Sequence, residues 1–453
     1  MKKYSAYKYS GVDWLERIPT AWDLEKLKFH GDIQFSNVDK VSELLESPIL
    51  LCNYVDVYKN EKIHSGIEFM QATANDNEIK KFKIKKGDVI ITKDSESVDD
   101  IAVPALVIED FQNVLCGYHL AQIKAQKKLT GEYLFRLFQS KDFNQNFESS
   151  ANGMTRYGLS VYTIKNVFTP IPPLSEQNSI VRFLDHKTGQ IDRFVANRQK
   201  QIELLKEQKA GIINNAVTKG LNPNVTMKPS EIEWVGEIPE HWRKLRLKNL
   251  TKRITNGFVG PTNNILKETG VRYIQALHVK QNTIIFNEPY YVDENWSREH
   301  PRSILRAGDI VITQTGAKTG DVGLVPKEFD GCNCHALIIV KSNSRKVIPE
   351  YLLNLLTSKF GNSLLESIRT GSMHPHLNST IVCDIYLPIP EGIIEQQSIL
   401  DYIKSETSTI DTLISKFQKQ IDLMQEYRIA LISHAVTGKI DVRDWQPKPR
   451  NKS

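Results

Sequence analysis

The sequence predicts a mixed α/β fold (α+β) in which two similar domains are separated by two long helices that form an antiparallel coiled coil. Two stretches predict the helices, from Glu176 to about Val217 and from Glu395 to about Val436, because each repeats apolar residues every seven positions. The chain before each stretch predicts the domains, because the two segments match each other at an offset of 219 to 220 residues. Antiparallel pairing would bring the end of the second helix to the start of the first domain, a circular pseudo-two-fold arrangement.

The helical repeat is carried mainly by leucine and isoleucine, with glutamine, lysine and glutamate between them. The repeat positions are Leu184, Ile191, Arg198, Leu205 and Ile212 in the first stretch, and Ile403, Ile410, Phe417, Met424 and Leu431 in the second. Few globular helices keep a seven-residue repeat for so long, so we interpret it as a coiled-coil seam, with core helices of two duplicated domains as the alternative. Arg198 falls in register with Phe417 and is expected to extend its charged end out of the seam.

The two domains are expected to contain the same series of elements. Each opens with an Ile-Pro-x-x-Trp entrance, at Ile18 and Ile238. Each then has a β-branched run behind a Gly-Asp turn, a second strand and a short helix with leucines on one face. The expected ranges are 86–93, 120–124 and 133–139 in the first domain, and 307–314, 336–341 and 351–357 in the second.

Each domain ends in a polar loop and a proline-rich exit into its long helix. The loops are 151–157 and 370–378, and Ser175 is expected to cap the first helix. These signals define the first domain, the first helix, a linker with the second domain, the second helix and a C-terminal tail. Their boundaries are residues 1–172, 173–217, 218–390, 391–437 and 438–453, respectively.

Composition and charge restrict the class of protein. The 453 residues carry a net charge of +6, which permits a nucleic-acid partner without requiring one. No run of about 18 apolar residues and no signal-peptide pattern occurs, so we expect a cytoplasmic protein without a membrane partner. The five cysteines lack paired spacing. The cluster from Cys332 to His335 is the one metal-site candidate, and a buried strand is the preferred interpretation.

The sequence contains no recognisable catalytic set, so we predict no catalytic and no metal-binding residue. Residues 316–320 lack the spacing of a phosphate loop, and His119 and His335, which we take as equivalent, have no nucleophile motif beside them. The Asn/Asp-Pro-Pro-aromatic motif with which amino-methyltransferases hold a flipped base is also missing. Two similar domains on a rigid spacer suit a bipartite ligand, and duplex DNA offers similar surfaces every helical turn of about 34 Å.

The duplicated order of these motifs resembles the specificity subunit of type I restriction-modification systems. The resemblance rests on the tryptophan entrances, the Gly-Asp strands, the loop from Gly371 to Asn378, the proline exits followed by Glu-Gln, and helices that end in Ala-Val-Thr. It covers nearly the whole chain. It implies two target-recognition domains, each of which reads one half of a split DNA sequence, and helices that set the spacer and dock methyltransferase subunits. The first loop departs from the pattern, because it lacks the Leu-Asn pair, although Leu159 aligns with Leu377.

The resemblance also implies partners that supply the chemistry. It implies no cofactor in this chain, because S-adenosylmethionine would bind to two methyltransferase (M) subunits that methylate adenine N6. ATP and Mg²⁺ would belong to the restriction and motor (R) subunits. The chain itself would be a non-catalytic ligand of double-stranded DNA, and base flipping would be carried out by its partners.

The expected DNA contacts lie in polar loops at strand ends or before the long helices, where Arg and Lys suit guanine or phosphate and Asn and Gln suit adenine. The candidates are Lys93, Ser95, Arg156 and Tyr157 in the first domain, and Gln314, Thr315, Lys318, His374 and His376 in the second. Two alternatives are a self-contained DNA enzyme and a non-enzymatic coiled-coil scaffold with two peptide- or protein-binding domains. Methylation by the chain alone would favour the enzyme, and duplex binding with a bipartite preference would eliminate the scaffold.

Overall fold

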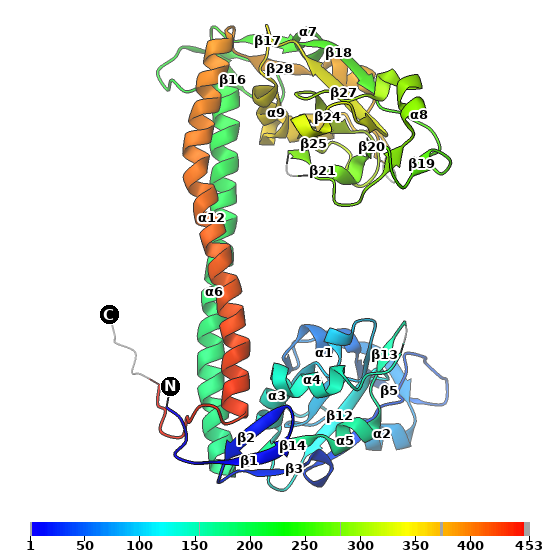
Figure 1. The fold of residues 1–453 in the computed structure, drawn as a ribbon, viewed down its shortest axis with the longest axis vertical. Coiled ribbons are helices and arrows are strands. Elements are labelled where there is room, and N and C mark those ends of the chain that lie inside the picture. Colours follow the sequence, from blue (N-terminus) through cyan, green and yellow to red (C-terminus); the bar gives the residue numbers. More distant parts are fainter. Residues whose placement is uncertain (1, 154, 281, 372–374, 448–453) are drawn as a thin grey trace. The chain divides into compact units, whose positions relative to one another are not determined.

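The structure is a computed structural model that describes residues 2–153, 155–280, 282–371 and 375–447. Its contacts divide the chain into two units, residues 1–198 with 419–453 and residues 199–418. Each unit contains one mixed α/β domain, which we call domain 1 or domain 2, and one half of each long helix (Figure 1). This division runs through the helices, so the domain boundaries given above stay a prediction.

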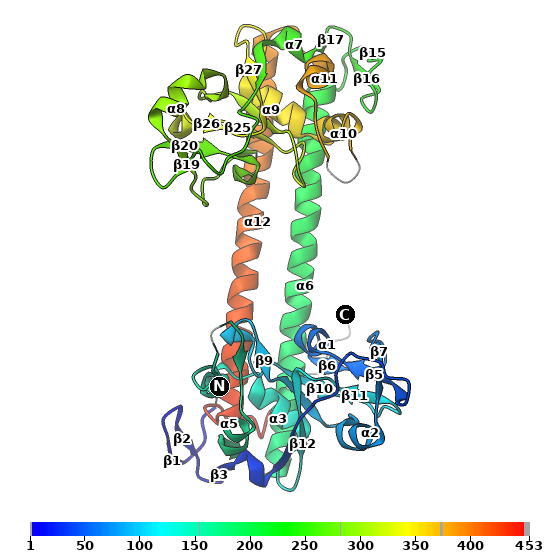
Figure 2. The same ribbon diagram turned by 90° about the vertical axis from the view of Figure 1, so that its right-hand side faces the viewer.

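The long helices are α6 (Leu174–Lys219) and α12 (Ile393–Val436). In each unit, half of one helix packs beside half of the other (Figures 1 and 2). Unit 1 contains the start of α6 and the end of α12, and unit 2 contains the remaining halves, so the helices run antiparallel within each unit. The prediction of mixed domains with an antiparallel pair of long helices is therefore confirmed.

Buried isoleucines of the two long helices recur every eleven positions. They are Ile180, Ile191 and Ile202 in α6, and Ile399, Ile410, Ile421 and Ile432 in α12. An eleven-residue repeat gives about 3.67 residues per turn, close to the 3.6 of a straight helix, so the pair needs little supercoiling. The predicted seven-residue repeat holds in part, because Leu205 and Ile212 are only partly buried. Its buried members are Leu184, Ile191, Ile403, Ile410 and Leu431. Arg198 lies with its guanidinium 5.1 Å from the centroid of the Phe194 ring.

Domain 1 is built on a five-stranded sheet with the strand order β4-β12-β8-β10-β6. The strands are β4 (Gly31–Phe35), β12 (Leu120–Ala125), β8 (Val89–Thr92), β10 (Pro104–Val107) and β6 (Lys62–Ile63). Every residue of β8 and β10 is buried, which explains their β-branched and apolar sequences, and α3 (Gly131–Phe138) packs on them. A second sheet contains β11 (Val114–Cys116), β5 (Ser47–Cys52) and β7 (Met70–Ala74). The remaining elements are β1 (Tyr7–Val12), β2 (Leu15–Pro19), β3 (Asp23–Lys26), α1 (Tyr54–Lys59), α2 (Asp76–Phe82), β9 (Asp94–Ser95), α4 (Lys141–Glu148), β13 (Tyr157–Gly158), α5 (Val161–Asn166) and β14 (Phe168–Ile171).

Domain 2 repeats this plan with a four-stranded sheet in the order β18-β27-β24-β25. The strands are β18 (Thr251–Asn256), β27 (Leu337–Ser342), β24 (Ile310–Thr313) and β25 (Val322–Leu324). A second sheet contains β19 (Leu266–Lys267), β23 (Tyr291–Val292), β20 (Val271–Ile274) and β26 (Asn333–Cys334). Cys334 is buried in β26, in agreement with the interpretation of its cluster as a strand. The remaining elements are β15 (Met227–Pro229), β16 (Glu237–Pro239), β17 (Arg243–Arg246), α7 (Leu247–Leu250), β21 (Val279–Lys280), β22 (Thr283–Ile284), α8 (Glu294–Glu299), α9 (Pro349–Thr357), α10 (Lys359–Ser367), α11 (Ser379–Asp384) and β28 (Tyr386–Ile389).

The register of the central strands defines which residues of the two domains are equivalent. The last residue of β8 faces the first residue of β12, and the last residue of β24 faces the first residue of β27. The residues just before β12 and β27 are His119 and Ala336. The predicted equivalence of His119 with His335 is therefore wrong by one residue.

The repeated tryptophans and Glu-Gln pairs join each domain to a long helix. The buried Trp22 donates an indole hydrogen bond to Glu176 at the start of α6 (3.0 Å), and Trp242 donates one to Glu395 at the start of α12 (2.9 Å). The glutamine after each glutamate accepts a hydrogen bond from the residue that precedes α3 or α9. These motifs therefore hold the fold together. The predicted cap is misplaced, because α6 begins at Leu174 and Ser175 lies inside its first turn.

Candidate nucleic-acid interface

The candidate residues of domain 1 lie on two loops that are joined by backbone hydrogen bonds. β9, which follows β8, pairs with β13 in the loop before the long helix. The amide of Leu159 donates to the carbonyl of Lys93 (2.8 Å), and Asn152 and Gly158 bond to each other through both backbone groups. We call this surface loop face 1, defined by residues 93–95, 118–119, 152–153 and 155–158.

Domain 2 repeats the same hydrogen bonds at what we call loop face 2, residues 314–319 with 370–371 and 375–376. The amide of Leu377 donates to the carbonyl of Gln314 (2.9 Å), and Thr370 and His376 bond to each other through both backbone groups. Leu377 thus corresponds to Leu159, as the sequence alignment predicted, and Gln314 corresponds to Lys93. The two faces share one backbone framework and display different side chains.

Lys93 is a half-buried cation in loop face 1. Its ammonium group donates to the carbonyl of Ser36 (3.0 Å) and lies 4.5 Å from the ring centroid of Tyr118 and 5.3 Å from that of Phe35. Burial lowers the pKa of Lys93, and the negative charge of Asp94 opposes that shift. The side chain is held in place by neutral groups, so its charge remains available to a phosphate.

Ser95 and Tyr157 lie opposite each other where β9 pairs with β13. Ser95 is 5% exposed, and its hydroxyl lies 3.1 Å from the hydroxyl of Tyr54, which gives it an internal partner. Tyr157 is partly exposed. Of these two candidates, Tyr157 has the side chain that can reach a ligand without rearrangement.

Arg156 is half exposed and is fixed by two residues that the sequence analysis did not select as contacts. Its Nε donates to Asp94 (2.8 Å), and its Nη2 lies 2.7 Å from the same carboxylate oxygen. His119 Nδ1 lies 2.7 Å from that oxygen as well. Asp94 carries no recognisable motif and becomes visible as a partner only when β9 pairs with β13.

Loop face 2 carries uncharged side chains and one lysine. Gln314 is 6% exposed, and its amide oxygen has no hydrogen-bond partner among the residues that the structure describes. Thr315 and Lys318 are exposed, and His376 is partly exposed and bridges to Thr315. His374 lies outside the described residues.

The former phosphate-loop candidate is a closed turn of the chain. The hydroxyl of Thr319 donates to the carbonyls of Gly316 (2.6 Å) and Pro375 (2.9 Å), so it ties the two loops of face 2 together. Within residues 2–153, 155–280, 282–371 and 375–447, no three His, Cys, Asp or Glu side chains are grouped so that they could hold a metal ion. No helix formed by these residues is long and apolar enough to cross a bilayer.

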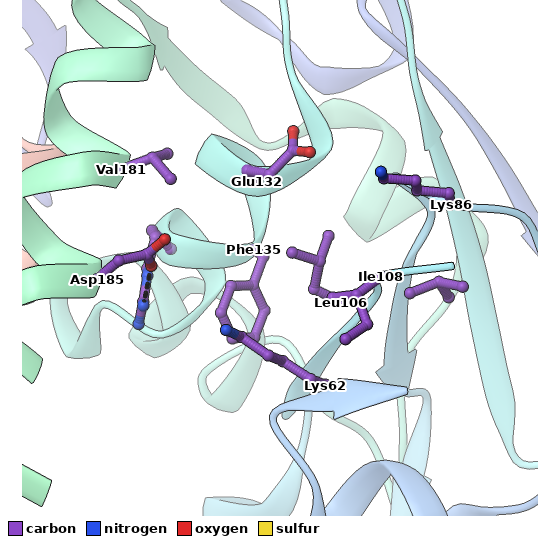
Figure 3. Close-up of a pocket in the computed structure, with 10 residues that line it drawn as sticks. Lys62, Lys86, Leu106, Ile108, Glu132, Phe135, Val181 and Asp185 are labelled. Carbon is purple, nitrogen blue, oxygen red and sulfur yellow. Dashed lines mark hydrogen bonds and ion pairs between the residues drawn. The ribbon is translucent and has the colours of Figure 1, made fainter. Parts of the chain in front are cut away.

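A cavity of about 180 Å³ lies in unit 1 between α3, β10 and α6 (Figure 3). Phe135 and Leu106 form its apolar wall, and Lys62 and Asp185 stand at its edge with opposite charges. The buried guanidinium of Arg136 forms an ion pair with Asp185 at this edge. The cavity therefore belongs to the attachment of domain 1 to α6 and not to loop face 1.

The two domains share one fold, and each presents a loop face with different side chains. This arrangement is typical of a protein that recognises a bipartite ligand. The family model described as the type I restriction modification DNA specificity domain matches residues 37–204 and 224–423. The chain therefore belongs to this family, in which two domains recognise DNA sequence and other subunits carry the methyltransferase and endonuclease activities.

Curated relatives and solved structures agree with this family over nearly the whole chain. The chain is 23% identical to the type I restriction enzyme MjaVIII specificity subunit of Methanocaldococcus jannaschii, over 94% of this chain and 95% of that protein. It is 21% identical to the EcoKI specificity subunit of Escherichia coli K12, over 80% and 77% of the two chains. A chain from a solved type I R-M system superposes with a TM-score of 0.69 at 16% identity, covering 93% and 99%. The HsdS subunit from Thermoanaerobacter tengcongensis gives 0.50, also at 16% identity, covering 93% and 98%.

Proposed function

We propose that domain 1 and domain 2 each read one half of a bipartite duplex sequence through loop faces 1 and 2, and that α6 and α12 set the spacer between the halves. The observation that supports this most directly is the repeated hydrogen-bond framework, which holds different polar side chains at equivalent positions. The shared framework would orient both loop faces in the same way towards DNA, and their different side chains would let each face recognise a different base sequence.

The candidate residues divide into two roles at these faces. Lys93 and Lys318 supply positive charge for phosphates, which gives affinity and a dependence on salt but no sequence information. The candidates for base edges are Arg156, Tyr157 and Ser95 in loop face 1, and Gln314, Thr315 and His376 in loop face 2. His374, which lies outside the described residues, stays a candidate from the sequence. Ser95 and Gln314 are buried and would contribute only after a local rearrangement.

The proposed assembly contains two methyltransferase subunits, which would bind S-adenosylmethionine, and restriction subunits, which would use ATP and Mg²⁺. The names of the curated relatives and the solved type I R-M system support this assembly. Adenine N6 methylation in the cytoplasm is then the activity that this chain directs, because its own loop faces select the site.

The test is to map the methylated sequence after co-expression with the methyltransferase subunits of its own system. The intact chain should direct N6-methyladenine to one split motif. The double variant Lys93→Ala/Arg156→Ala should lose or change one half of the motif, and Lys318→Ala/His376→Ala should affect the other half. A change in both halves by either variant would contradict the division into two readers, and the absence of any split motif would contradict the function.

A second experiment tests the helices as a spacer. Eleven residues inserted in the middle of both α6 and α12 preserve the repeat of buried isoleucines and lengthen each helix by roughly 16 Å. The spacer of the methylated motif should then change, or methylation should be lost. Full methylation with the original spacer would contradict the role of the helices. An insertion of eleven residues in one helix alone serves as the control for a mismatched seam.

A further inference from the structure

In domain 1, two side chains from separate segments of the chain, those of Arg156 and His119, meet at one carboxylate oxygen of Asp94. Asp94 Oδ1 lies 2.8 Å from Arg156 Nε, 2.7 Å from Arg156 Nη2 and 2.7 Å from His119 Nδ1. The Asp94 side chain is 17% exposed and that of Arg156 is 47% exposed. The carboxylate therefore lies at the base of loop face 1, and the guanidinium reaches the surface.

The donors and acceptors of this cluster leave one edge of the guanidinium open. An ionised carboxylate only accepts hydrogen bonds, so His119 Nδ1 carries the proton and donates to Asp94. The same nitrogen then cannot accept from Arg156 Nη2, although it lies 3.2 Å away. Asp94 occupies the Nε side of Arg156, which leaves Nη1 and the outer N–H of Nη2. Among the described residues, no other hydrogen bond or ion pair of this guanidinium is recorded.

Two parallel N–H donors on a planar guanidinium match the O6 and N7 acceptors that guanine presents in the major groove. Gly153, three residues before Arg156, occupies a position that only glycine can fill. Gly153 has a φ of +145°, and a Cβ there would lie 1.9 Å from the carbonyl oxygen of Arg156. The side chain of Arg156 is therefore held by Asp94 before a ligand arrives, which lowers the entropy lost on binding.

Loop face 2 lacks the residues that hold the arginine. Thr315 stands at the position of Asp94, and Ala336 stands at the position of His119. The side chain that accepts from the arginine and the one that braces the acceptor are both absent there. Among the described residues, the equivalents of Asp94 and His119 in loop face 2 therefore cannot hold an arginine in the same way.

We propose that Arg156, held by Asp94 and His119, reads a guanine in the half of the target that domain 1 contacts. Asp94 and His119 are positioning residues, because they act through the arginine. This inference rests on the proposed function, in which loop face 1 contacts base edges.

The test uses the complex with its methyltransferase subunits and synthetic duplexes of the mapped motif. Each guanine of the half read by domain 1 is replaced in turn by 7-deazaguanine, which removes the N7 acceptor and keeps the base pair. One replacement should weaken binding by the intact complex by about ten- to a hundredfold. Arg156→Ala should bind more weakly than the intact chain and should respond to none of the replacements.

Two further variants separate reading from charge. Arg156→Lys keeps the positive charge but loses the forked donors, so it should retain affinity and lose discrimination between guanine and adenine at that position. Asp94→Asn should reduce the same discrimination while the half read by domain 2 remains unchanged. Lys80→Ala is the matched control, because it removes one exposed charge from α2 of domain 1. His119 precedes β12, whereas α2 lies near the end of β12, where the ammonium of Lys124 donates to the carbonyl of Lys81.

The outcomes distinguish the inference from the function on which it rests. A split motif without guanine in the half read by domain 1 would overturn the assignment of Arg156 and leave the proposed function intact. If the intact complex bound all 7-deazaguanine duplexes equally well, the assignment of Arg156 would also be overturned. This result does not depend on whether any variant folds. Absence of any split motif would overturn the proposed function itself.

Discussion

At loop face 1, a lysine and an arginine lie near an aspartate and a histidine, and the arginine and the histidine both contact the aspartate. At the same positions of the same hydrogen-bond framework, loop face 2 has Gln314, Thr315 and Ala336. The backbone bonds are retained because buried amide and carbonyl groups need partners whatever the side chains are. The side chains are free to differ because they project from this framework, so one scaffold can present two chemistries.

The two domains also differ in how they are fastened to the long helices. In unit 1, the guanidinium of Arg428 on α12 pairs with Glu61 of domain 1 and lies 3.2 Å from Asp192 of α6. By the offset of 219 residues, the equivalent of Arg428 is Lys209, which pairs with Asp411 (2.6 Å), the equivalent of Asp192. No ion pair from Lys209 to domain 2 is recorded among the described residues. At this position an ion pair joins domain 1 to a long helix, and the described residues show no equivalent pair in domain 2, whose His241–Glu395 pair lies elsewhere, at the start of α12.

The largest expected effect concerns a feature that the two domains share. Trp22→Ala and Trp242→Ala each remove a fully buried indole and its hydrogen bond to a glutamate, so each should cost about 3–5 kcal/mol of the free energy of unfolding. The loss should be confined to the unit that carries the substitution. Urea unfolding followed by hydrogen exchange of each unit measures this. Equal loss of protection in both units would show that the chain unfolds as one cooperative body.

The comparison of attachments predicts a smaller effect with a clear asymmetry. Arg428→Met should destabilise unit 1 by about 1 kcal/mol, because Glu61 and Asp192 are half exposed and regain water. Amide exchange should become faster around residues 59–63. Lys209→Met is the matched substitution in unit 2 and should leave exchange in domain 2 unchanged. Similar acceleration in both domains would contradict the ionic attachment as the cause.

Much of the fold could be predicted from the sequence because apolar periodicity and duplication are visible without a structure. The long helices and central strands follow from these patterns, and the motifs around Trp22 and Glu176 mark where domain and helix join. Ile191, Ile202 and their neighbours are compatible with both a seven-residue and an eleven-residue repeat. The sequence alone does not show which of the two repeats the buried contacts between the helices will follow. The choice depends on how closely two straight helices can pack, which is a property of the pair.

The candidate interface could be located from the sequence, but its internal partners could not. Lys93 and Arg156 were selected because polar residues at strand ends are exposed to ligands. The sequence does not reveal Asp94 and His119 as partners, because their role depends on the pairing of β9 with β13. Asp94 and Arg156, which this pairing brings together, are 62 residues apart in the chain. Contacts between distant segments leave no local pattern.

The smallest predicted effect is a pH dependence that distinguishes domain 2 from domain 1. His278 is buried, its Nδ1 accepts from the amide of Gln275 (2.9 Å) and its Nε2 donates to the carbonyl of Glu288 (2.7 Å). Burial lowers its pKa, and burial also lowers the pKa of His335. Both rings therefore take up protons less readily in the folded domain than in the unfolded chain. Their contribution to stability is present above pH 6.5, the ordinary pKa, and is lost as the pH falls towards the lowered pKa.

Burial raises the pKa of Asp56 and Asp88 in domain 1 and of Asp309 in domain 2. This shift has the opposite effect on stability, since folding then favours the protonated carboxyl group. It is common to both domains, so the lowered pKa values of His278 and His335 set domain 2 apart. Acidification from pH 7.5 to 5.5 should therefore reduce the protection of domain 2 in hydrogen exchange, after correction for intrinsic rates, and leave domain 1 nearly unchanged. His278→Gln removes a titrating ring and should flatten the response of domain 2. If domain 1 lost protection as steeply as domain 2, the buried histidines would not be the cause. The two domains would then differ in the chemistry of their loop faces and in their ionic attachment, but not in their response to protons.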